Sequence, residues 1–469
     1  MTDRPANNRI ILFALVLGTF MTALDATIVS VALPTMAEEL LEAGHDTSNI
    51  SWVLLIYTLM LCCFILLWSK LGSNKGYKKV FMTGVAVFAG SSLMIGLCGF
   101  IPELGLNAII LLRAVQGMGA GMVTAMSLAM VSSYLPKEIR GSSIGAVTLA
   151  ASAGTAFGPA IGGILTTFHW SYIFFINVPI GLLCLFLCFR YMNVKENLEN
   201  AGKLDFTGAA MLFVMLFTLI YYLNKGSDFG WMSETGIALI FVMMIAAGLA
   251  FWWEQRVKDP LVDLKVIRNP MILRSVTVTM LLFMAMAGSY LLLPYYLQFV
   301  QGYETMEYGF ILIANSIGMM VMGPIVGKLA DRTGRNKRFI VAGALVCAVG
   351  FYMMMLYNAD TGLGWILLSL FVMGAGIGMA MVACTNLSFE YITEGQNGQL
   401  SGITNTFRQA GSSSGVAILN AVFMAFIVTS PAVDLVPGFK HAFFIAIIIA
   451  LLAFVVGMGL KDRERESSA

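Results

Sequence analysis

The chain has 469 residues, of which 58% are hydrophobic and only 12% are charged, and its mean hydropathy is +0.83. Soluble domains carry about 25% charged residues, so this composition argues against a water-soluble enzyme. The net charge of +2 leaves no basic excess to neutralise a phosphate backbone, which argues against nucleic acid as a partner.

Fourteen apolar stretches are long enough to cross a bilayer, which takes about 20 residues of helix. In chain order they cover residues 9–33, 50–68, 79–100, 106–132, 141–167, 171–190, 204–223, 234–253, 271–298, 307–328, 338–357, 363–389, 398–430 and 439–460. They predict an all-α integral membrane protein. The first stretch is longer than the roughly 7–15-residue core of a cleavable signal peptide, so we expect it to remain as a spanning helix.

The positions of Lys and Arg predict the orientation, because basic residues resist translocation and gather in cytoplasmic loops. With the N-terminus inside, 23 of the 28 basic residues fall in cytoplasmic segments. Only Lys225 and Lys440 fall in outer segments, while Arg113, Arg274 and Arg408 lie within spans or at their edges. We therefore expect both termini to be cytoplasmic, in a multi-pass protein of the plasma membrane.

A short basic loop occurs twice in the chain. Residues 69–79, after the second stretch, align without gaps on residues 327–337, after the tenth. One copy would be an ordinary cytoplasmic loop, but two copies at equivalent places predict two similar six-helix halves. The predicted domains are an N-terminal bundle, a two-helix connecting hairpin and a C-terminal bundle, at residues 1–200, 201–256 and 257–469. The hairpin has no charge inside its spans, so we expect it to be peripheral.

Charged residues inside the spans are the candidate functional residues. Asp25 is the only acid placed well inside a span, where an ionised carboxylate costs about 2.5–3.5 kcal/mol or more. Burial favours the neutral form, so this carboxyl could load a proton from one face and release it to the other; alternatively it bonds a neighbouring helix. Arg113 has the same burial problem with the opposite sign, which a structural ion pair or snorkelling of the side chain would relieve. For Arg408, near the cytoplasmic interface, snorkelling is favoured.

Other chemistries have no matching residues in the sequence. The seven cysteines lie in apolar runs and His45, His169 and His441 are far apart, so we expect no metal site. The phosphate cradle G-x-x-x-x-G-K-[ST] of an ATP-driven pump does not occur, and no nucleophile has a candidate base. These features predict no enzyme and no cofactor, and leave ion-coupled or passive transport.

Five segments resemble signatures of the major facilitator superfamily, and the resemblance covers almost the entire chain. They are the loop at residues 327–337, the first-helix run LDATIVSVALP at 24–34, the fourth-helix run RAVQGMGA at 113–120, the fifth-helix glycines at 145–163, and the start of the sixth helix at 170–181. The first-helix run and the start of the sixth helix resemble the fourteen-span drug:proton antiporter branch, and the fifth-helix glycines resemble the antiporter pattern. Ser73 replaces the usual loop Asp, Ser30 a usual Asn, and Ser171 a usual Arg.

The resemblance implies a major facilitator fold with fourteen transmembrane helices in a 6+2+6 arrangement, and two pseudo-symmetric bundles around a central cavity. It implies a proton-coupled antiporter that exports hydrophobic or cationic drug-like compounds by alternating access. The alternative is a proton-coupled exporter of an endogenous metabolite or lipid. The expected partners are a small-molecule substrate, protons and the lipid bilayer, and the expected oligomeric state is a monomer.

The candidate site residues follow from these motifs and from the spans. For proton coupling they are Asp25 and Arg113. For a cytoplasmic gate they are Gly327, Asp331, Arg332, Gly334 and Arg335. For the antiporter helix motif, which could act as a close-packed pivot or only as tight packing, they are Gly145, Gly154, Gly158, Pro159, Gly162 and Gly163. For a substrate cavity they are Tyr57, Gln116, Tyr290 and Asn315.

Overall fold

The computed structural model describes residues 8–42, 44–47, 49–101, 105–194, 204–393, 396–428 and 435–463. In these ranges the chain is helical and contains no strand. Thirteen helical segments are long and apolar enough to cross a membrane; the predicted 398–430 span is not among them, so the count of fourteen stays a prediction. The predicted boundary at residues 200/201 lies outside the described residues, as do Arg4, Lys195, Lys203 and Arg465.

The described helices form two groups with a hairpin between them in sequence. The first group is α1 (Asn8–Glu42), α2 (Trp52–Lys75), α3 (Tyr77–Cys98), α4 (Leu106–Tyr134), α5 (Arg140–Thr166), α6 (Tyr172–Phe175) and α7 (Asn177–Tyr191), with a 3-10 turn, η1 (Lys137–Ile139), before α5. The hairpin is α8 (Phe206–Phe229) and α9 (Glu234–Glu254), followed by the short α10 (Leu264–Arg268). The second group is α11 (Pro270–Tyr295), α12 (Thr305–Thr333), α13 (Asn336–Met355), α14 (Leu363–Glu390), α15 (Asn397–Val428) and α16 (Val436–Met458), with a π-turn, η2 (Tyr296–Val300), after α11.

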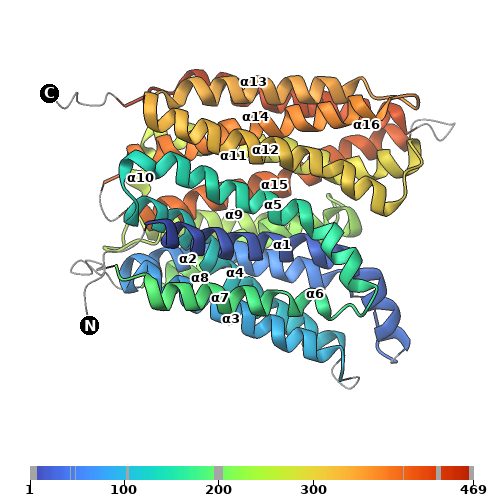
Figure 1. Ribbon diagram of the computed structural model, residues 1–469, viewed down its shortest axis with the longest axis horizontal. Coiled ribbons are helices and arrows are strands. Elements are labelled where there is room, and N and C mark those ends of the chain that lie inside the picture. The colour runs from blue at the N-terminus through green and yellow to red at the C-terminus, as the bar shows by residue number, and fades with distance from the viewer. Residues whose placement is uncertain are drawn as a thin grey trace.

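Each group packs mainly within itself, and the two meet along a few helix pairs. Within the first half, α1 packs on α5 and α4 packs on α2 and α3; within the second, α14 packs on α12 and α13, and α11 packs on α15. The halves meet where α5 packs on α12 and where α15 packs on α2 and α4. In Figure 1 the first half lies below and the second above, with α5 and α15 between them.

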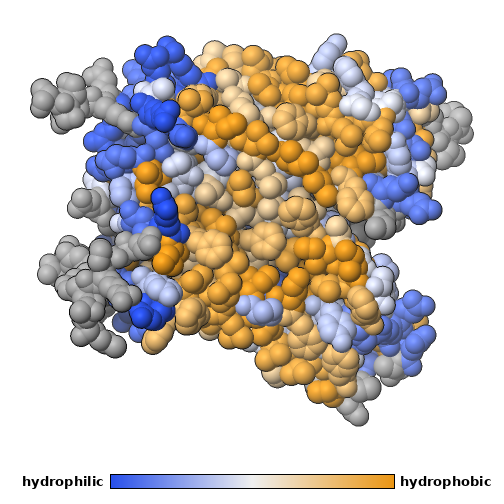
Figure 2. All heavy atoms as spheres, in the orientation of Figure 1, coloured by the Kyte–Doolittle hydropathy of each residue, from blue (hydrophilic) through white to orange (hydrophobic). Residues whose placement is uncertain are grey.

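The outer surface of the bundle is largely apolar. The helices therefore carry apolar residues on their outward faces as well as on the faces that pack together. Large apolar side chains such as Leu111, Phe189 and Phe241 are more than half exposed. Figure 2 shows a broad hydrophobic band between two hydrophilic ends on the face that it draws. A soluble protein rarely exposes a continuous apolar surface of this size, so the band is the lipid-facing surface of a multi-pass membrane protein.

One end of the bundle carries many basic loop residues and is called the basic end below. It includes Lys78, Lys137, Arg335 and Lys337, and it is the end at which α16 finishes (Figure 1). The repeated loop forms equivalent tight turns here, from α2 to α3 and from α12 to α13. Gly76 and Gly334 have φ angles of 98° and 65°, a backbone region that glycine enters without strain. The two copies of the loop therefore have matching structural roles.

The hairpin lies against the outside of the seam where the halves meet. Helix α8 contacts both α2 and α15, which also contact each other, whereas α9 packs mainly on α8 and most of its side chains are exposed. Aromatic contacts attach α8 to α2: Trp52 stacks on Tyr221 with 5.8 Å between centroids, and Phe64 meets Phe213 in a tilted arrangement at 5.3 Å. The hairpin is therefore peripheral, but it bridges both halves.

Helix α1 is longer than the predicted span of residues 9–33. It continues through Pro34 and ends at Glu42. Residues 35–42 are mostly Ala, Glu, Leu and Met, which favour helix, so the helix outlasts the apolar stretch from which the span was predicted. A proline is tolerated in a spanning helix when neighbouring groups satisfy the backbone that it frees.

Candidate functional site

The centre of the first half contains a buried ion pair. Nη1 of Arg113, on α4, lies 2.7 Å from Oδ2 of Asp25, on α1, and the two side chains are 1% and 0% exposed. Each helix is apolar around its charge, so each charge would be strongly destabilised alone. The structure thus brings together the two residues predicted for proton coupling, which are 88 positions apart.

Three uncharged polar side chains complete the hydrogen bonds of this pair. Gln116, one turn along α4, accepts from Nη1 of Arg113 at 2.6 Å and donates to Oδ1 of Asp25 at 3.0 Å. Asn177, the first residue of α7, donates to the same Oδ1 at 2.9 Å. Ser92 of α3 accepts from Gln116 at 2.6 Å. All three are completely buried, so four helices share one polar network in an apolar bundle.

The remaining contacts of Arg113 hold its guanidinium in place. Its Nε donates to the carbonyl oxygen of Val53 at 3.0 Å. The guanidinium also lies over the ring of Tyr57, 4.3 Å from the centroid, in a cation–π contact. Tyr57 in turn donates to the carbonyl oxygen of Thr22 at 3.3 Å. Arg113 therefore connects α4 to α1 and α2.

One acceptor of this network has no partner among the described residues. Oδ1 of Asn177 is buried and accepts no hydrogen bond from them, although Nδ2 of the same amide donates to Asp25. Rotating the amide by 180° would turn this oxygen toward Asp25, and amide orientation is assigned from the network. A protonated carboxyl needs an acceptor and a carboxylate needs donors. Asn177 can therefore serve either protonation state of Asp25.

The four residues predicted for a substrate cavity lie in two places. Tyr57 and Gln116 belong to the buried network just described. Tyr290 and Asn315 are in the second half, on α11 and α12, where Tyr290 donates to the carbonyl oxygen of Leu312 at 3.0 Å. Asn315 is 3% exposed, and its Oδ1 accepts no hydrogen bond from any residue within the described ranges. That these residues line one cavity stays a prediction.

A second polar site lies at the basic end and, unlike the Asp25 network, it joins the two halves. Asp331, near the end of α12, accepts hydrogen bonds from the backbone N–H groups of Gly141 and Ser142, both at 2.8 Å. These groups lie in the first turn of α5, where amides lack intrahelical partners and the helix dipole favours a negative charge. Of the other residues predicted for this gate, Gly334 makes the turn after α12, and the side chains of Arg332 and Arg335 are exposed.

The equivalent contact of the other half is made without a charge. The backbone N–H of Gly398, in the first turn of α15, donates to the hydroxyl of Tyr77 at 3.2 Å. Ser73, where the family pattern has Asp, donates to the carbonyl oxygen of Ser69 and lies 3.3 Å from the same hydroxyl. Asn397 adds hydrogen bonds to Ser132 and Ser133, both at 2.9 Å.

Glycines of α5 allow close contact with two different helices. A Cβ at Gly145 would lie 2.8 Å from the carbonyl oxygen of Gly323 on α12, and one at Gly154 would lie 2.6 Å from the carbonyl oxygen of Phe20 on α1.

The remaining motif positions divide in the same way. Gly158 and Gly162 face α1, Pro159 lies inside the helix, and a Cβ at Gly163 would meet nothing within 4 Å. At the basic end, a Cβ at Gly327 would lie 2.3 Å from the carbonyl oxygen of Gly141. Helix α5 therefore packs backbone to backbone with a helix of its own half and with one of the other half.

These features define a class of protein. A multi-pass helical bundle with two similar halves, a buried charge network and helix-cap contacts between the halves is a membrane transporter. The chain belongs to the Major Facilitator Superfamily, whose sequence model matches residues 15–416. Members of this family are transporters and not enzymes, which confirms the prediction made from the sequence.

Known proteins resemble the chain over most of its length. The multidrug resistance protein Stp of Mycobacterium tuberculosis is 31% identical over 89% of this chain and 76% of its own length. The tetracenomycin C resistance and export protein of Streptomyces glaucescens is 29% identical over 88% of this chain and 75% of its own length. The crystal structure of the human organic anion transporter MFSD10 (TETRAN) superposes with a TM-score of 0.71 at 16% identity, covering 97% of this chain and all of that one, and thus shows a common fold.

Proposed function

We propose that the protein is a proton-coupled antiporter that exports hydrophobic or cationic drug-like compounds by alternating access. It acts as a monomer in the plasma membrane with the basic end in the cytoplasm. The names of the two bacterial relatives, a multidrug resistance protein and an antibiotic export protein, support this substrate class. The excess of basic residues at one end supports the orientation.

The observation that carries the proposal is the Asp25–Arg113 network. A carboxylate buried among apolar helices is stable here because Arg113, Gln116 and Asn177 all contact it. Protonation of Asp25 would remove the counter-charge of a buried guanidinium, which destabilises this arrangement by several kcal/mol. Binding and release of one proton can therefore bias the packing of α1, α4 and α7.

The contacts between the halves support an assignment to one stage of the proposed transport cycle. Their hydrogen bonds gather toward the basic end, where Asp331 caps α5 and Tyr77 caps α15. Ser401 of α15 also donates to the carbonyl oxygen of Ala125 at 2.6 Å. We interpret the structure as the state that is closed to the cytoplasm. Opening the basic end would break these contacts, and proton movement at Asp25 supplies a free-energy difference for that change.

Transport by the purified protein in proteoliposomes tests the proposal. With a proton gradient imposed, we expect uphill accumulation of a lipophilic cation such as tetraphenylphosphonium, and loss of that accumulation when nigericin collapses the gradient. Accumulation that persists without the gradient would contradict proton coupling. If a lipid or metabolite is driven by the gradient while lipophilic cations are not, the proposed substrate class is wrong and the coupling stands.

A further inference from the structure

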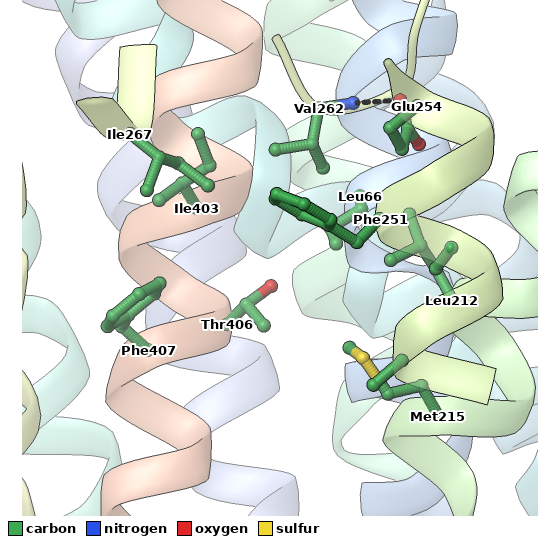
Figure 3. Close-up of a pocket in the computed structure, with 12 residues that line it drawn as sticks. Leu66, Leu212, Met215, Phe251, Glu254, Val262, Ile267, Ile403, Thr406 and Phe407 are labelled. Carbon is green, nitrogen blue, oxygen red and sulfur yellow. Dashed lines mark hydrogen bonds between the residues drawn. The ribbon is translucent and has the colours of Figure 1, made fainter. Parts of the chain in front are cut away.

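A cavity of about 260 Å³ lies between the hairpin and the seam of the two halves. Figure 3 shows its walls, which come from α2, α8, α9 and α15 and from the segment around α10. Nearly all of the lining is apolar and it includes the rings of Phe251 and Phe407. Cavities of this kind bind small hydrophobic ligands when a few polar groups fix the ligand's orientation.

Two polar side chains line this cavity and have buried atoms without partners. Glu254, the last residue of α9, is 5% exposed. Its Oε2 accepts a long hydrogen bond of 3.4 Å from the backbone N–H of Val262, and among the described residues its Oε1 has no hydrogen-bond partner. The hydroxyl of Thr406, on α15, also has no partner in the part of the chain that the structure describes. A buried polar atom left unbonded is costly, so these atoms indicate a ligand that would bond them.

The charges around Glu254 favour a cation. The carboxyl lies at the C-terminus of α9, the negative end of the helix dipole. Asp205 is a second nearby acid, and its carboxylate accepts from Nε1 of Trp253 at 2.8 Å. Lys70 of α2 is near enough for its charge to act on Glu254, but among the described residues no Lys or Arg lies within ion-pair distance of this carboxylate. A cation in the cavity would remove this imbalance.

We propose that the cavity is an accessory binding site for amphipathic organic cations, separate from the Asp25 network. The cationic nitrogen lies beside Glu254, and the apolar body packs among Phe251 and Phe407, whose rings can also interact with the positive charge. Because α2 and α15 belong to different halves and α8 bridges them, a cation bound here contacts both halves. The site does not depend on proton coupling.

Photolabelling of the full chain in lipid nanodiscs tests this site. The probe is a diazirine derivative of 4-phenylbutyltrimethylammonium, used below saturation, and labelled peptides are identified by mass spectrometry. We expect label on the α9 and α15 peptides that contain Phe251 and Phe407. Glu254→Gln keeps an acceptor for Val262 but removes the charge, and should reduce this labelling about tenfold. The matched control is Glu234→Gln, an exposed acid at the other end of α9, which should label like the wild type.

Two further measurements keep the result interpretable if the Gln variant does not fold. Thr406→Val should weaken labelling, and the uncharged carbon isostere of the probe should label the wild type about tenfold less than the cation. Equal labelling by the isostere, or undiminished labelling of folded Glu254→Gln, would overturn the proposal and identify the cavity as a site for a neutral lipid chain. Nanodiscs sustain no proton gradient, so failure here is distinguishable from failure of proton coupling.

Discussion

Asp331 and Tyr77 perform the same task with different chemistry. Each accepts hydrogen bonds from the first turn of a helix in the opposite half: Asp331 from two backbone N–H groups of α5, and Tyr77 from one of α15. A carboxylate at a helix N-terminus forms charge-assisted hydrogen bonds, which are about twice as strong as neutral ones. The Asp331 contact should therefore contribute more to keeping the basic end closed.

This asymmetry gives a prediction about two substitutions. Asp331→Asn removes the charge from a contact that crosses the halves, and we expect it to lower the initial transport rate roughly tenfold. Ser73→Ala removes a hydroxyl whose bonds lie within its own half, so its effect should be mild. The measurement is the initial rate of substrate uptake into inverted vesicles at matched expression. Equal, mild effects of the two substitutions would count against a gating role for Asp331.

The sequence predicts part of the buried network and misses the rest for a physical reason. Asp25 and Arg113 are conspicuous because charges are rare inside spans. Their pairing depends on how α1 and α4 are rotated about their axes, which hydropathy does not report. Ser92 and Asn177 are uncharged and compatible with a spanning helix, so composition does not distinguish them, although Asn177 interrupts an apolar run.

Helix α5 takes part both in the packing within the first half and in the packing between the two halves. Its glycines at positions 154, 158 and 162 face α1, and those at 141 and 145 face α12. The glycine spacing in the sequence predicts close packing, but it does not say which helix each glycine meets or that Gly163 meets none. The partners become known only when the helices are placed in space.

Two alanine substitutions on α5 test this packing. In Gly145→Ala the new methyl group would lie 2.8 Å from the carbonyl oxygen of Gly323 and 2.9 Å from Cα of Pro324, both backbone atoms that cannot turn aside. We expect the closed basic end to be destabilised and the initial transport rate to fall at least about fivefold, because overpacking costs roughly 1–3 kcal/mol. Initial efflux at equal reconstitution is the measurement.

The control for that substitution lies on the same helix. Gly163→Ala places a methyl group where nothing lies within 4 Å, so transport should stay near the wild-type rate. If both variants transport like the wild type, the close approach of α5 and α12 is not required for transport. If both lose transport equally, the loss does not depend on the close contact between the halves at Gly145, because the methyl group at position 163 meets nothing.

For the whole molecule, the repeated loop is the sequence feature that best predicts the architecture. Both copies form the same turn at the basic end, and each adjoins a cap on a helix of the other half. The hairpin is predicted less completely. It is peripheral as expected, but Glu254 stands at the end of its span, where an acid looks solvent-exposed in sequence, and only the packing of α8 and α10 buries it.

The central claim is that protonation of Asp25 couples the proton gradient to transport through both halves. The most direct measurement compares pH-gradient-driven substrate flux with substrate exchange at equal pH, in proteoliposomes containing wild type, Asp25→Asn or Asp25→Glu at equal reconstitution. We expect Asp25→Asn to retain exchange and to lose gradient-driven accumulation, because its amide cannot take up or release the proton. Asp25→Glu should retain partial coupling, since the carboxylate is displaced by one methylene. Undiminished gradient-driven flux in Asp25→Asn would contradict the assignment.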